Sequence, residues 1–113
     1  MKEQARITTY REFWPFYLRQ HAHPETRYWH IVGTGAGTAL LVAAIISFSP
    51  ALLFGAILAG YGPAWAAHFF LEKNRPATFR YPVWSLISDY RMAIAWLNGE
   101  LAGELEKAGI PGK

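Results

Sequence analysis

The stretch YWHIVGTGAGTALLVAAIISFSPALLFGAILAGYGPAWAAHFFL, residues 28–71, contains no Asp, Glu, Lys or Arg. A membrane-spanning helix needs about 20 mainly apolar residues, so this stretch has room for two such helices and a turn. Ser49-Pro50 lies near its middle and predicts that turn. A water-soluble domain of this size would normally carry charges on every helix. The sequence therefore predicts a small all-α integral membrane protein built on a two-span hairpin.

The segments on either side of the hairpin complete a single membrane domain over residues 1–113. Thr9-x-x-Glu12 is a capping box, and the aromatic residues that follow it suit a helix lying at the level of the lipid head groups. A later apolar stripe predicts a third helix, either a short span or an interfacial helix, with the interfacial position favoured. The expected elements are an interfacial helix at 10–22, spans at 26–48 and 51–71, the third helix at 83–97 and a solvated tail at 98–113.

Composition and charge exclude several classes of protein. The chain has no cysteine, which removes disulfides, thiolate metal sites and cysteine nucleophiles. Its net charge is +3, but the basic residues are dispersed on both sides of the uncharged stretch, so we do not expect nucleic-acid binding. Basic residues flanking a hairpin on both sides indicate that both of its ends face the cytoplasm. Residues 1–20 lack the apolar segment of a cleavable signal peptide.

Small residues recur at helical spacing within the two spans. Gly33-xxx-Gly37 and Ala56-xxx-Gly60 are pairs that allow close contact between helices in lipid. Such faces also favour self-association, so a homo-oligomer is one expectation. The glycines at 33–37 do not have the spacing of a dinucleotide-binding fingerprint, which also follows a strand.

Histidines are the residues that a purely structural hairpin does not explain. Reflecting His30 about the turn at Ser49-Pro50 gives position 69, so His30 and His68 should lie at the same depth. His21 and His23 come just before the first span and approach the same level. Histidines and carboxylates are common ligands of non-haem iron and of zinc, so this cluster predicts a metal site of either kind.

Two carboxylates could join the histidines, although each has a simpler explanation. Glu72 follows His68 by four residues and shares its helix face. It could equally be an end charge that extends to the membrane surface. Asp89 is the only aspartate in the chain and lies on the third helix, where it could instead pair with a neighbouring arginine. His30 alone could be an interfacial side chain, and His23 could be a capping residue.

Three segments together resemble a known family. They are FYLRQHAHPETRYWHIVGT at 16–34, GYGPAWAAHFFLEKNRPATF at 60–79 and PVWSLISDYRM at 82–92. They are similar to the 2-hydroxy fatty acid dioxygenase-like family of small integral membrane proteins, formerly a domain of unknown function. The yeast member is an iron-dependent enzyme of the endoplasmic reticulum that shortens 2-hydroxy fatty acids by one carbon. The present chain looks like a bacterial relative, which would place it in the bacterial cytoplasmic membrane.

The resemblance implies a chemistry for the candidate residues. His21, His30 and His68 would hold Fe(II), helped by Glu72 or Asp89. The substrates would be a 2-hydroxy fatty acid and O2, and the residues that steer the carboxylate would be Arg75 or Arg80. The acyl chain would lie between the two spans or along the aromatic face of the helix at 10–22. Two alternatives remain open: a non-catalytic membrane protein that binds lipid head groups, and a hydrolase that uses zinc-activated water.

Overall fold

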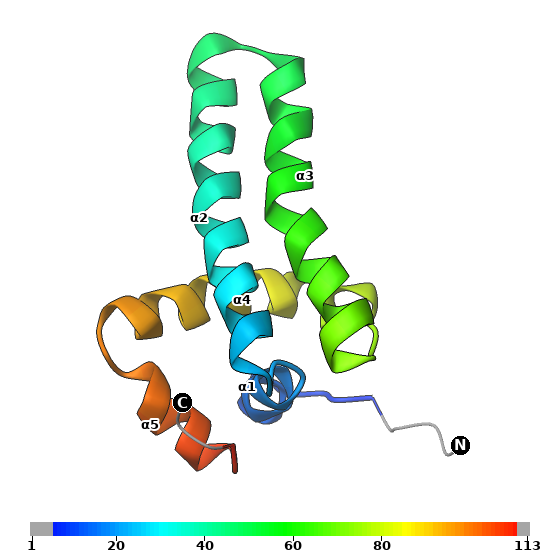
Figure 1. The fold of residues 1–113 in the computed structure, drawn as a ribbon, viewed down its shortest axis with the longest axis vertical. Helices are drawn as coiled ribbons and strands as arrows, with labels where there is room; N and C mark the ends of the chain where they lie inside the picture. The colour runs from blue at the N-terminus through cyan, green and yellow to red at the C-terminus, as the bar shows by residue number, and fades with distance from the viewer. Residues whose placement is uncertain (1–5, 111–113) are drawn as a thin grey trace.

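The computed structural model describes residues 6–110, and this part of the chain consists of helices and loops without strands. The all-α class predicted from the sequence is confirmed. Two long helices stand side by side as a hairpin, and the shorter helices gather at its open end (Figure 1). The elements are α1 (Tyr10–Arg19), α2 (Pro24–Ser47), α3 (Pro50–Ala67), a π-helical turn (His68–Glu72), a 3-10 turn (Ala77–Phe79), α4 (Pro82–Leu97) and α5 (Leu101–Lys107).

The hairpin reverses direction at the predicted turn. Phe48 adopts a left-handed conformation with φ of 52°, which ends α2. The Ser49 side chain then accepts a hydrogen bond from the backbone N–H of Leu52 and caps α3, whose first residue is Pro50. A hydroxyl at the N-cap and a proline at the first helical position both favour a helix start.

Small residues bring the two long helices into close contact. A Cβ atom added at Gly37 would lie 3.0 Å from Cα of Gly60, and one added at Gly33 would lie 3.0 Å from the Gly60 carbonyl oxygen. Both glycines are therefore required for this approach of the two backbones. These small residues pack α2 against α3 within one chain. Self-association of the protein therefore stays a prediction that this contact does not test.

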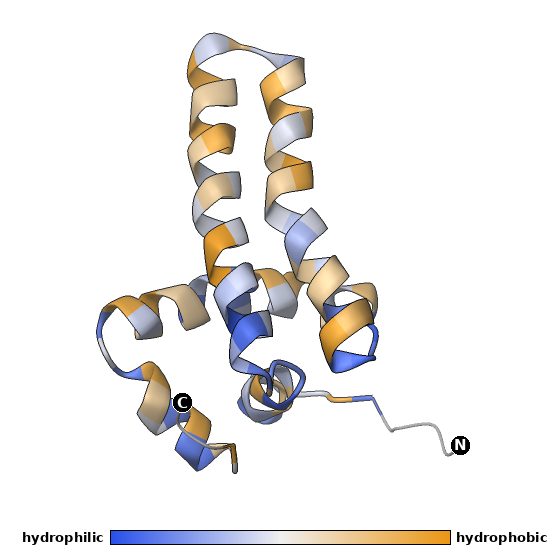
Figure 2. Cartoon of the chain, in the orientation of Figure 1, coloured by the Kyte–Doolittle hydropathy of each residue, from blue (hydrophilic) through white to orange (hydrophobic). Residues whose placement is uncertain are grey.

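Two helical segments, Pro24–Ser47 and Pro50–Glu72, are long and apolar enough to span a membrane. Hydrophilic residues concentrate at the open end of the hairpin, whereas its upper part is mostly apolar (Figure 2). Large apolar side chains on this upper part are exposed, including Ile46, Phe48, Phe54 and Leu58. An exposed apolar surface of this extent is typical of contact with lipid or another apolar partner.

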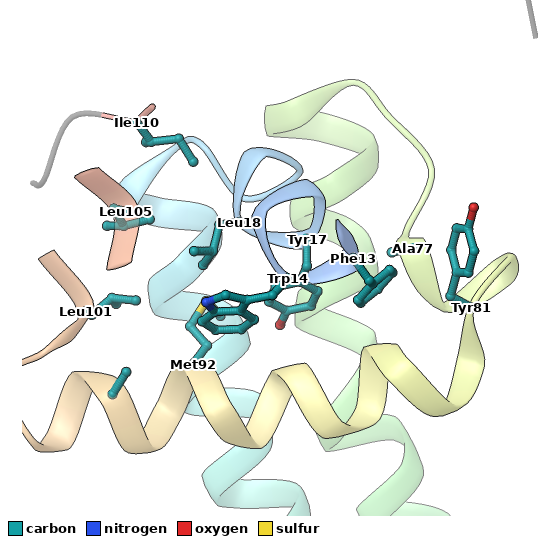
Figure 3. Packing of buried hydrophobic residues seen from close by; sticks show 11 residues of the cluster. Phe13, Trp14, Tyr17, Leu18, Ala77, Tyr81, Met92, Leu101, Leu105 and Ile110 are labelled. Atoms are coloured by element: carbon teal, nitrogen blue, oxygen red, sulfur yellow. The ribbon is translucent and has the colours of Figure 1, made fainter. Parts of the chain in front are cut away.

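The hydrophobic core of the described residues lies below the hairpin and is built around α1; we call it the lower core. Phe13, Trp14, Tyr17 and Leu18 are buried there against residues of α4 and α5 (Figure 3). The aromatic face of α1 thus packs inside the protein, in contrast to the expectation that it lies at the level of the head groups. A buried aromatic cluster also fixes the position of α1 relative to the hairpin.

The last two helices complete this lower core. The predicted apolar stripe of α4 points outward, with Val83 and Leu97 among its exposed members, whereas Ser85 and Ser88 are buried against the core. The C-terminal part differs from the expected solvated tail, because α5 buries Leu101 and Leu105. The i,i+4 spacing of these two leucines gives the short helix one apolar face.

Candidate metal centre

Three separate segments carry the histidines of the site. His21 follows the end of α1, where its backbone N–H donates to the carbonyl of Leu18. His30 lies in the second turn of α2, and His68 begins the π-helical turn that extends α3. The guanidinium of Arg27 donates to the carbonyl oxygens of His21 and Ala22, at 2.8 and 2.9 Å. This contact fixes the loop between α1 and α2 and so the position of His21.

The three imidazoles converge at the open end of the hairpin. His21 Nε2 lies 3.0 Å from His30 Nε2 and 3.1 Å from His68 Nε2. One ligand atom from each side chain lies within 4.8 Å of the others, and all three residues are buried. The structure thus brings together three of the four histidines that the sequence placed near one level, and His23 is not among them.

Each of the three imidazoles contacts an oxygen atom through its Nδ1, on the side of the ring away from the other histidines. His21 Nδ1 lies 2.6 Å from the carbonyl oxygen of Tyr17, and His68 Nδ1 lies 2.7 Å from Oδ1 of Asn74. His30 Nδ1 lies 3.3 Å from Oδ1 of Asp89. All three partners are acceptors, which favours the tautomer of each neutral ring that carries its hydrogen on Nδ1.

This arrangement leaves an unprotonated Nε2 on every ring. In this tautomer the lone pair of His21 Nε2 faces those of His30 and His68 and repels them, because no ring nitrogen there carries a hydrogen to donate. A cation placed between them satisfies all three. Metal-bound histidines almost always donate their other ring N–H to a carboxylate, a carbonyl or a water, as these do. The donor set therefore fits a transition-metal ion that accepts imidazole ligands.

Burial sets the charges around the site. It lowers the pKa of His21 well below the ordinary value, and the neighbouring His30 and His68 lower it further. The His21 ring is therefore neutral at pH 7, which is the form that binds a metal. Burial also raises the pKa of Asp89, an effect that the hydrogen bond from Tyr17 opposes.

Tyr17 and Asn74 are two residues of the site that the sequence analysis did not identify. The Tyr17 hydroxyl donates to Oδ1 of Asp89, and its ring packs on the imidazole of His21 with centroids 4.1 Å apart. Because Tyr17 precedes His21 by four residues and α1 ends only two residues before His21, this i,i+4 spacing was a usable signal. Asn74 returns to His68 only because the π-helical turn ends at Lys73 in a left-handed conformation with φ of 59°.

The other predicted site residues lie outside the group of three histidines. Glu72 accepts a hydrogen bond of 2.8 Å from the backbone N–H of His23, which is exposed at the N-cap of α2. Asp89 contacts His30 from the side opposite the Nε2 atoms. Arg75 is exposed, and the guanidinium of Arg80 lies over the ring of Tyr81. In this conformation the structure does not bring Arg75 or Arg80 to the histidines.

Comparison with known proteins bears on what this centre does. The family model described as 2-hydroxy-palmitic acid dioxygenase Mpo1-like matches residues 7–101, which include the three histidines and Asp89. No curated protein matches the chain significantly, and no solved structure does either. The family's description is that of a dioxygenase of a 2-hydroxy fatty acid. The resemblance noted in the sequence is confirmed, and the chain belongs to the 2-hydroxy-palmitic acid dioxygenase Mpo1-like family.

Proposed function

We propose that this protein is an Fe(II)-dependent dioxygenase of the membrane surface that removes one carbon from 2-hydroxy fatty acids. The observation that carries the proposal is the convergence of three buried histidine Nε2 atoms, on rings whose Nδ1 atoms each face an acceptor, at the end of an apolar hairpin. The family description names the substrate class. The ligand set alone also suits zinc, so the choice of iron rests on the oxygen chemistry in that description.

In this proposal His21, His30 and His68 hold the ion. An iron ion bound by few protein ligands supplies open positions at which O2 and an oxygen-bearing substrate can meet. Asp89 fixes the orientation of the His30 ring, and Asn74 and the Tyr17 carbonyl do the same for the other two rings. Tyr17 keeps Asp89 in place by donating its hydroxyl hydrogen to it.

The location of the centre suits an amphiphilic substrate. The histidines are buried at the open end of the hairpin, on or next to the ends of α1, α2 and α3. That end of the hairpin is its hydrophilic end (Figure 2). We propose that the hairpin inserts into a lipid bilayer, so that a fatty acid presents its polar head group at this level. Its hydrocarbon chain then stays in an apolar environment throughout the reaction.

Metal content and oxygen consumption test this function together. Protein purified anaerobically in detergent and loaded with Fe(II) should bind about one iron per chain and consume O2 with 2-hydroxyhexadecanoate but not with hexadecanoate. His68→Ala should lose both properties. His23→Ala is the matched control, because His23 is an exposed histidine outside the group of three, and it should keep both.

The alternatives give different results in the same experiment. Tight zinc binding without oxygen consumption would favour a hydrolase and contradict the proposal. Absence of metal from well-folded protein that was offered iron would favour a lipid-binding role. Equal behaviour of His68→Ala and His23→Ala would show that the three histidines are not the metal site.

A further inference from the structure

We propose that a groove between α2, α3 and α4 holds the hydrocarbon chain of the substrate and that Ile57 limits which chains can enter it. The inference rests on the proposed function and adds the path of the chain. The groove has a volume of about 170 Å³, and its lining is mainly apolar. Asp89 lines one end, whereas Leu41 and Leu53 line the end nearer the hairpin tip.

The groove approaches the candidate metal centre at Asp89, which lies behind the ring of His30. Asp89 lines the groove and at the same time contacts Nδ1 of His30 at 3.3 Å. Its polar end therefore lies on the Nδ1 side of the His30 ring, and Asp89 is the only charged side chain among its lining residues. A ligand with a polar head and a long apolar tail matches this distribution of polar and apolar surface.

The close contact of α2 and α3 shapes the groove. Gly33, Gly37 and Gly60 line it and have no side chains, so part of its surface is helix backbone. Tyr90 of α4 lines the groove and forms a hydrogen bond of 2.5 Å with the hydroxyl of Thr38 on α2. This bond links α4 to the hairpin along one side of the groove.

Its length matches part of a long acyl chain. Gly33 and Leu41 both line the groove and are eight residues apart on α2, which corresponds to about 12 Å along the helix, or roughly ten methylenes of an extended chain. A chain of 16 carbons would leave the groove beside Leu41 and Leu53 and continue along the exposed apolar surface of the hairpin. Ile57 lies about one turn beyond Tyr61, so a short chain ends before reaching it.

Two other locations suit the chain less well. The aromatic face of α1 is closed, because Phe13 and Tyr17 are buried in the lower core. A larger pocket, of about 370 Å³, lies between α2, α4 and α5 and is lined by Tyr28, Leu101 and their neighbours. Neither the three histidines nor Asp89 line that pocket. A chain placed there would not border the centre.

A matched pair of tryptophan variants tests the groove. Ile57 and Leu58 are adjacent on α3 and similarly exposed, at 51% and 55%, but only Ile57 lines the groove. Ile57→Trp should lower kcat/KM for 2-hydroxyhexadecanoate at least tenfold and change that for 2-hydroxyhexanoate less than twofold. Leu58→Trp should change neither by more than twofold. Equal effects of the two variants, or equal effects of Ile57→Trp on both acids, would overturn the proposal.

Cross-linking keeps the groove testable if the protein turns over neither acid. A 2-hydroxyhexadecanoate analogue with a photoreactive diazirine in mid-chain is added to the Fe(II)-loaded protein in detergent. Cross-links to groove residues such as Leu41 and Leu53, reduced by Ile57→Trp but not by Leu58→Trp, support the groove even if the proposed reaction is wrong. Cross-links at Tyr28 and Leu101, or spread evenly over the hairpin, would overturn it.

Discussion

Asp89→Asn tests how the carboxylate serves the metal centre. The replacement keeps the shape of the side chain and an oxygen that can accept the hydrogen bond from Tyr17, but it removes the negative charge beside His30. We expect the fold to survive and the affinity for Fe(II) to fall. The reason is that a carboxylate on Nδ1 increases the electron density of the ring and fixes its orientation.

The size of the loss follows from the contact. Asp89 lies 3.3 Å from Nδ1 of His30, and its side chain is 13% exposed, so solvent screens the interaction little. Hydrogen bonds to charged groups contribute about 1.5–3 kcal/mol. Replacing residues that contact metal ligands typically weakens metal binding about 10- to 100-fold, which is the same range. We therefore expect a 10- to 100-fold increase in the dissociation constant.

Competition with a chelator of known affinity measures this constant under anaerobic conditions. Glu72→Gln is the control, since Glu72 accepts a backbone hydrogen bond from His23 and an amide oxygen can do the same; we expect a change of less than about threefold there. A loss beyond a thousandfold in Asp89→Asn would show that Asp89 binds the metal directly. Equal changes in the two variants would refute the assigned role of Asp89.

Three further predictions concern the stability of the fold. Gly37→Ala should destabilise the hairpin by about 1–3 kcal/mol, because its methyl would meet Cα of Gly60 at 3.0 Å. Gly35→Ala is the control and should not destabilise it, because open space surrounds Gly35. Equal melting temperatures of the two variants in detergent would contradict the close contact. Burial lowers the pKa of His21 below its ordinary value near 6.5, so the unfolded chain binds that proton more readily. The free energy of unfolding of the metal-free protein should therefore be highest above pH 6.5 and fall as the pH is lowered below that value. Denaturant titrations at several pH values measure it, and a free energy that rises below pH 6.5 would contradict the prediction. Leu105→Ala should cost about 2–5 kcal/mol, because Leu105 is 2% exposed, and unchanged denaturation would show that α5 does not contribute to the core.

The depth of two histidines was predictable from the sequence by counting alone. Antiparallel helices rise equally per residue, so residues at equal distance from Ser49-Pro50 face each other. His30 and His68 accordingly have ring centroids 5.0 Å apart. The inference needed only the turn, which proline and a capping serine mark clearly.

The contacts behind the rings depend on details that the sequence conceals. An asparagine six residues after His68 would lie on another face of a regular α-helix. The π-helical turn changes this spacing, and π-helical turns are frequent at functional sites. Helix periodicity does not reveal such a turn, so Asn74 could not be predicted as a partner of His68.

The sequence also could not predict which face of α4 is buried. Its apolar stripe gives the helical period but not the direction, because a membrane protein can turn apolar residues toward lipid as well as toward a core. The buried side includes Ser88, which is hydrogen-bonded to the hydroxyl of Tyr10 at 2.8 Å, and Met92. Two members of the outward stripe, Leu86 and Tyr90, line the groove instead of the core.

The lower core explains why the hairpin alone is insufficient for the site. His21 and His68 are each held by a partner within their own segment, but His30 depends on Asp89, which is distant in sequence. Asp89 is placed by α4, and α4 is tied to α1 through Tyr17. The aromatic residues of α1 and the leucines of α5 fix that pair of helices. Loosening the lower core should therefore disturb His21, which Tyr17 of α1 holds, and the contact of Asp89 with His30, before the hairpin itself changes.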